Sequence, residues 1–139
     1  MKNLFKYSSW LPIIAAIGLL LTGCSKESDV VIFNNANSAI EVTCRGQNII
    51  VERNSSCQVS YDSIAEGFTI RIDTNSSTYK IPVMNARKAS KLSKHKTWMD
   101  ILTVQLNSDG AIYVVAPDTK LPTSQYPEQP DNFPLKPSK

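Results

Sequence analysis

Short apolar segments, separated by turn-forming residues, constrain the fold of this 139-residue chain more than any other feature. The segment FTIRID at 68–73 alternates apolar and polar residues, as a strand does when one face is buried and the other meets water. Comparable segments recur at 30–34, 39–44, 48–52, 57–61, 68–74, 78–83, 101–106 and 111–116. Short strands at this spacing predict an all-β fold, a small antiparallel β-sandwich of about 7–8 strands over residues 30–116.

Turn and edge signals refine this prediction. The sequence Asn107-Ser108-Asp109-Gly110 separates two strand-like segments and is typical of a hairpin turn. Pro82 lies within the segment 78–83, and proline has no backbone N–H to donate to a strand neighbour. We therefore expect that segment to form an edge strand.

Two segments do not fit the strand pattern. Residues 86–98 are basic and contain no acidic residue, so we expect a short helix or a long crossover loop there. Residues 117–139 contain six prolines and predict an extended, partly polyproline II tail, either free or laid along the domain surface, that adds little to the core. The cations of the basic run are Arg87, Lys88, Lys91, Lys94 and Lys96.

The N-terminus has the layout of an export signal. Lys2 and Lys6 precede an apolar run at 11–21, which is too short to span a bilayer. The run ends in Leu21-Thr22-Gly23-Cys24, which resembles the lipobox of bacterial lipoproteins. This resemblance implies that residues 1–23 are removed as a lipoprotein signal peptide, that Cys24 carries the lipid, and that residues 24–29 act as a tether. In enteric-type bacteria, an aspartate after the lipidated cysteine retains a lipoprotein in the inner membrane. Ser25 is at that position here, so the resemblance implies an outer-membrane lipoprotein, which we expect to face the periplasm.

Two cysteines then remain, Cys44 and Cys57. An exported chain meets an oxidising compartment, and each of these cysteines shares the inward phase of its predicted strand. We therefore predict a Cys44–Cys57 disulfide, which closes a loop of about 14 residues and stabilises by roughly 3 kcal/mol in the chain-entropy model. A metal or redox pair is the alternative, but the spacing is not that of a CxxC motif.

The sequence predicts no catalytic, cofactor-binding or metal-binding residue. His95 is the only histidine, it lies among lysines, and no nucleophile motif is present. Removal of Lys2 and Lys6 with the signal lowers the formal charge from +3 to about +1, which does not favour nucleic-acid binding. We therefore expect a protein that is not an enzyme and that binds no nucleic acid.

The expected function is that of a binding or accessory module for envelope components. The membrane is reached through the N-terminal lipid, an envelope protein is the expected partner, and the basic run is a candidate contact with anionic lipid or lipopolysaccharide. Three alternatives remain open: a subunit of an envelope secretion or assembly machine, an inhibitor or immunity-type protein against an envelope enzyme, and a hydrolase with an unrecognised carboxylate site. For the first, the size, anchor and expected sandwich are similar to those of the small outer-membrane lipoprotein of type VI secretion, an analogy that no sequence motif supports.

Overall fold

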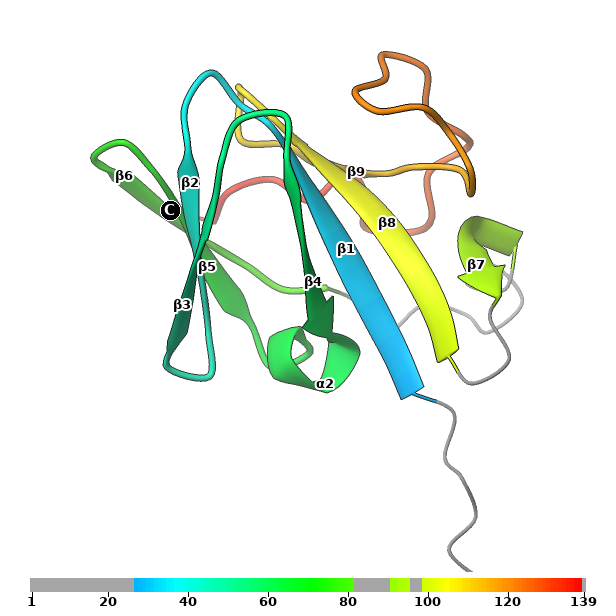
Figure 1. Ribbon diagram of the computed structural model, residues 1–139, viewed down its shortest axis with the longest axis horizontal. Coiled ribbons are helices and arrows are strands. Elements are labelled where there is room, and N and C mark those ends of the chain that lie inside the picture. The colour runs from blue at the N-terminus through cyan, green and yellow to red at the C-terminus, as the bar shows by residue number, and fades with distance from the viewer. Residues whose placement is uncertain (1–26, 82–90, 96–98, 139) are drawn as a thin grey trace, which may run out of the picture.

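Two β-sheets pack face to face in the computed structural model, which describes residues 27–81, 91–95 and 99–138 (Figure 1). Sheet A contains β1 (Glu27–Asn35), β4 (Ser56–Ser60), β7 (Ser93–His95), β8 (Met99–Asn107) and β9 (Ile112–Val114). Sheet B contains β2 (Ile40–Cys44), β3 (Gln47–Val51), β5 (Phe68–Ile72) and β6 (Asn75–Tyr79). A one-turn helix, α2 (Tyr61–Ile64), connects β4 to β5. The predicted all-β sandwich is confirmed.

The strands lie where the alternation of residues predicts them, because one face of each is buried between the sheets. In β2, Ile40, Val42 and Cys44 are buried while the residues between them are partly exposed. The same alternation buries Phe68 and Ile70 of β5. Each of the eight predicted segments overlaps a strand, and β6 is an edge strand of sheet B, as predicted, although Pro82 lies outside the described residues.

Sheet A is mixed and not wholly antiparallel as predicted. β1 and β8 run parallel and are paired along their whole length, from Glu27 with Met99 to Asn35 with Asn107. After sheet B the chain re-enters sheet A as β7, and β8 follows as the antiparallel neighbour of β7 and runs in the direction of β1. β1 also begins at Glu27, so the last part of the predicted tether, 27–29, belongs to the sandwich.

One edge of β8 is shared by two short strands. β7 pairs with β8 at residues 100–102, and β9 pairs with it at 104–106 through the predicted hairpin turn. In this turn the backbone N–H of Gly110 donates to the carbonyl of Asn107. β7 lies in the basic run, where the sequence predicts a helix or a crossover loop, so this strand was missed.

The proline-rich tail is part of the folded domain, and the prediction that it adds little to the core is wrong. Phe133 and Leu135 are both buried and belong to the hydrophobic core cluster. Leu135 exchanges two backbone hydrogen bonds with Ile112 of β9, and the backbone N–H of Ser138 donates to the carbonyl of Thr78 of β6. The tail forms no long strand or helix, as proline predicts, but it covers two strand edges and contributes apolar side chains to the core.

Candidate functional site

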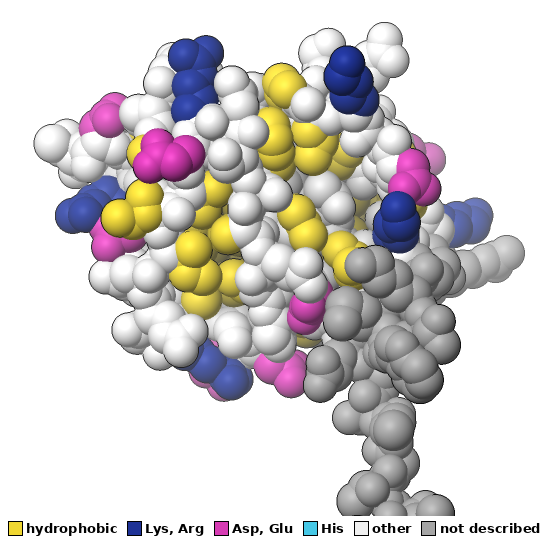
Figure 2. All heavy atoms as spheres, in the orientation of Figure 1, with side chains coloured by type: hydrophobic (Ala, Val, Ile, Leu, Met, Phe, Trp, Pro, Cys, Tyr) yellow, Lys and Arg dark blue, Asp and Glu magenta, His cyan; other side chains and the backbone are white. Residues whose placement is uncertain are grey.

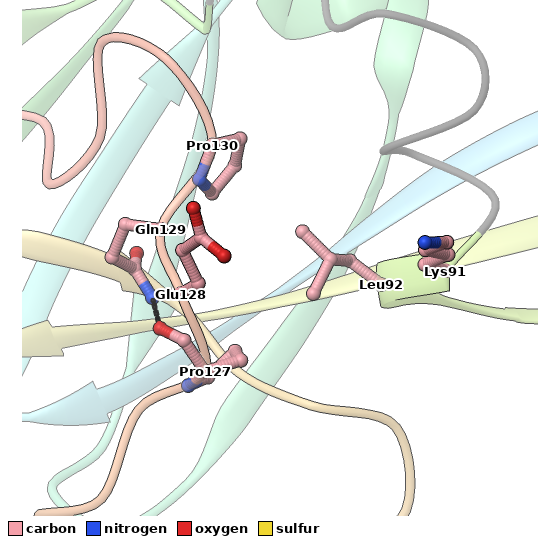
Figure 3. A pocket seen from close by; sticks show the side chains of 6 residues that line it. All are labelled: Lys91, Leu92, Pro127, Glu128, Gln129 and Pro130. Atoms are coloured by element: carbon pink, nitrogen blue, oxygen red, sulfur yellow. Dashed lines mark hydrogen bonds between the residues drawn. The ribbon is translucent and has the colours of Figure 1, made fainter.

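The two segments that do not fit the strand pattern, the basic run and the tail, meet in a cleft. Lys91 and Leu92, which immediately precede β7, form one wall, and the tail residues 127–130 form the other (Figure 3). The cleft has a volume of about 270 Å³ and is lined by Lys91, Leu92, Pro127, Glu128, Gln129 and Pro130. The sequence could not predict that these segments lie together.

The cleft forms where β8 changes partner. β9 ends at Val114 and β7 begins at Ser93, and both lie along the same edge of β8. Between the ends of two such strands a sheet edge has a gap that side chains or a ligand can fill.

Hydrogen bonds from Gln129 fix the tail wall of the cleft. The side-chain Oε1 of Gln129 accepts from the backbone N–H of Val114 at 2.9 Å, and its Nε2 donates to the carbonyl of Val114 at 2.9 Å. The amide group thus pairs with β9 as a strand backbone would. Nε2 also donates to the carbonyl of Pro127, a bond drawn in Figure 3, so the turn around Glu128 is held from both sides.

A second group of contacts holds the tail over the outer face of sheet A. Tyr126 stacks on Tyr113 with 4.3 Å between the ring centroids. Gln105 is fully buried beneath the tail, where its Nε2 donates to the hydroxyl of Tyr126 and its Oε1 accepts from the backbone N–H of Thr123. Burial of an amide is tolerated here because its polar atoms are hydrogen-bonded. These contacts therefore hold the tail in place on sheet A beside the cleft.

The tail also brings acidic side chains to the basic run. Lys94 Nζ lies 2.5 Å from Asp118 Oδ1, and Glu128 lines the cleft together with Lys91. Arg87, Lys88 and Lys96 lie outside the described residues, as does Cys24. On the face shown in Figure 2, the described Lys and Arg side chains are spread around the outline and mixed with acidic ones. The described part of the run is thus a mixed-charge surface, and contact with an anionic surface stays a prediction.

The two remaining cysteines lie in different sheets, Cys44 at the end of β2 and Cys57 in β4. Cys44 is buried in the hydrophobic core and Cys57 is partly buried against it, and their sulfur atoms are not bonded to each other in the structure. Burial raises the pKa of the Cys57 thiol, and the nearby Cys44 raises it further. The predicted bridge would join the two sheets, and it stays a prediction.

Other kinds of site find no support in the part of the chain that the structure describes. No group of three or more His, Cys, Asp or Glu side chains there could hold a metal ion. Within the same residues, no helix is long and apolar enough to cross a membrane. Comparison with known proteins finds no family that matches this sequence and no similar curated protein.

Of the residues that build the cleft, sequence reasoning singled out Lys91 and missed those of the tail wall. Gln105 alternates with the apolar residues of β8, a pattern that predicts exposure, but the tail covers its face of the sheet. In the tail, Phe133 and Leu135 are two residues apart, the spacing of a strand face, and this was the signal that could have placed the tail in the core. Nothing comparable marks Gln129.

Proposed function

We propose that this protein is a lipoprotein of the bacterial outer membrane whose β-sandwich binds an envelope protein through the cleft between Leu92 and the turn at 127–130. The lipobox ending in Cys24 supports the membrane anchor. The cleft supports binding, because it is the place where the two segments with the strongest compositional signals meet.

The chemistry of the cleft fits a side chain of a protein partner. Leu92, Pro127 and Pro130 supply apolar surface, while Lys91 and Glu128 supply charges of opposite sign. Small-molecule sites usually measure about 300–1,000 Å³, and this cleft is slightly smaller. A single apolar side chain, flanked by polar groups, is the kind of anchor that dominates the energy of protein interfaces.

Charge reversal of the cleft walls tests this function. We expect Lys91→Glu and Glu128→Lys each to reduce the recovery of an envelope partner from crosslinked cells by about tenfold, because each places a like charge against the partner group that its wild-type residue attracts. Lys120→Glu is the matched control, since Lys120 is exposed in the same tail and does not line the cleft. Unchanged recovery with both cleft variants would contradict the proposal.

The identity of the recovered proteins separates the two principal alternatives. A subunit of a secretion or assembly machine should be recovered with several structural components of that machine. An inhibitor or immunity-type protein should be recovered with a single enzyme. In both cases the protein acts by binding.

A further inference from the structure

The outer edge of β3 is a second surface with the properties of a binding site. Ile50 is 71% exposed, and no other large hydrophobic side chain of the described residues is comparably exposed. β3 is the first strand in the order β3-β2-β5-β6, so only β2 pairs with it in the described chain. An exposed edge strand with an apolar side chain is a template for another strand.

The turn before β3 determines which backbone groups are open. Arg45 and Gly46 both have positive φ, 45° and 75°, as a two-residue type I′ hairpin requires. In such a hairpin Cys44 and Gln47 form a hydrogen-bonded pair. Hydrogen-bonded and non-hydrogen-bonded pairs then alternate along the antiparallel ladder. Asn48 and Ile50 therefore direct their backbone N–H and C=O groups away from β2, toward the open edge.

Two other strand edges in the described part of the chain are covered. The edge of β9 is bonded by the Gln129 side chain and by the backbone of Leu135, and the edge of β6 is bonded by Ser138. β4 is also an edge strand, but its exposed side chains are Ser56, Gln58 and Ser60, which are polar. Among the described strands, β3 thus combines an open edge with an apolar side chain.

A shallow hollow lies beside Ile50 on the outer face of sheet B. It has a volume of about 230 Å³ and is lined by Ala39, Ile40, Glu41, Ile50, Arg71 and Asp73. Arg71 and Glu41 form an ion pair on its floor. A bulky side chain next to Ile50 would therefore find both an apolar contact and space over the sheet.

The length of chain before β1 decides what can occupy this edge. Cys24 is three residues from Glu27, so a lipid on Cys24 holds the start of β1 within about 10 Å of the membrane. Two copies that join through β3 must be antiparallel and related by a two-fold axis, which turns one of them upside down. Because β1 is nine residues long, the inverted copy would hold its tether about 30 Å from that membrane.

We propose that β3 is a strand-addition site, at which an extended segment of another envelope protein pairs with the backbone of Asn48 and Ile50. That segment carries a bulky apolar residue, which packs on Ile50. The site is separate from the cleft, since none of its residues lines the cleft. The choice of another protein over a second copy rests on the proposed lipid anchor.

Proline substitution tests the backbone pairing directly. Asn48→Pro removes an outward N–H and leaves the β2 ladder intact, whereas Asn48→Ala keeps that N–H. Both variants lose the hydrogen bond between Thr43 and the Asn48 side chain, so they form a matched pair. A photo-crosslinking amino acid in place of Glu52, just beyond β3, identifies the protein that lies next to this edge in cells that carry the full chain. The same amino acid in place of Ser76 on β6 is the control.

We expect Glu52 to crosslink to another protein in the wild type and in Asn48→Ala, and the adduct to fall at least about tenfold in Asn48→Pro. Ile50→Thr should reduce the adduct as well, because it removes apolar surface and preserves β propensity. An adduct with a second copy, an adduct that Asn48→Pro does not change, or no adduct at Glu52 would overturn the proposal.

Hydrogen exchange provides a measurement that does not depend on the proline variant. In the crosslinked complex the amides of Asn48 and Ile50 should become protected, while those of Ile49 and Val51 are protected in the free protein as well. Unchanged exchange at Asn48 and Ile50 would contradict strand addition even if Asn48→Pro does not fold. Loss of the cleft partner in Lys91→Glu with the Glu52 adduct retained would show that the two sites act separately.

Discussion

At the scale of single residues, Asn34 shows how a polar side chain can organise the core. It is fully buried at the end of β1, where its Nδ2 donates to the carbonyls of Ser38 and Val51 and its Oδ1 accepts from the backbone N–H of Ala36. These bonds connect the end of β1 to β3 and to the loop that leads into β2. Alternation places Asn34 on the inward face with Val30 and Ile32, but its partners are set by loops that local sequence does not define.

The two thiols give a prediction at the same scale. If Cys44 and Cys57 are bridged in the exported protein, peptide mapping without reductant should recover them as one linked pair, and loss of the bridge should cost roughly 2–5 kcal/mol of stability. Free thiols at both positions in protein taken from an oxidising periplasm would contradict the bridge.

The reduced protein should have a distinct pH dependence. The pKa of Cys57 is raised in the folded state, so the folded protein holds this proton more tightly than the unfolded chain does. Its contribution is therefore complete below the ordinary cysteine pKa and is lost as the pH rises through the higher folded value. Urea unfolding of reduced protein between pH 7 and 10.5, compared with Cys57→Ala, measures this loss at the alkaline end.

At the scale of elements, local pattern predicted the strands and long-range contacts decided the rest. Each of the eight predicted segments is a short apolar or alternating run between turn-forming residues, and each overlaps a strand of the sandwich. β7 contains Ser93, Lys94 and His95, which carry no apolar alternation, so its pairing with β8 could not be predicted. The parallel strands β1 and β8 are separated by more than sixty residues in the sequence. A pattern within either strand therefore cannot predict that they pair.

The tail is the element whose role changes most, and truncation tests that role. A chain that ends at Ala116 loses the buried side chains of Phe133 and Leu135, each of which contributes about 1.5–3 kcal/mol by burial. It also loses the bonds that cover β9. We expect such a chain to be destabilised by several kcal/mol or to remain unfolded, as measured by thermal and urea unfolding.

A shorter truncation is the matched control for the tail. A chain that ends at Leu135 keeps both buried side chains and loses only residues 136–139, of which 136–138 are exposed, with the contact between Ser138 and Thr78. Its melting temperature should fall by only a few degrees. A chain ending at Ala116 that unfolds at the same temperature as this control would show that the tail lies on the surface and adds little to the core.

At the scale of the whole molecule, the proposed lipid anchor would determine how the sandwich is oriented at the membrane. With the lipid on Cys24, the end where β1 starts faces the membrane, and the β3 edge and the cleft lie on the sides of the sandwich. Side surfaces remain accessible to other proteins of the same membrane. This orientation depends wholly on the lipid, which the sequence implies through its lipobox.

Lipidation of Cys24 is therefore the prediction on which the arrangement of the molecule depends. Intact-mass analysis of membrane-extracted protein should find a chain that starts at residue 24 and carries the mass of two or three acyl chains, because one chain alone gives only marginal, reversible membrane binding. Cys24→Ser should accumulate unprocessed or in the soluble fraction, whereas Ser25→Ala should be processed normally and serves as the control. Wild-type protein recovered entirely as a soluble periplasmic chain would remove the anchor, and with it the reason for preferring another protein to a second copy at β3.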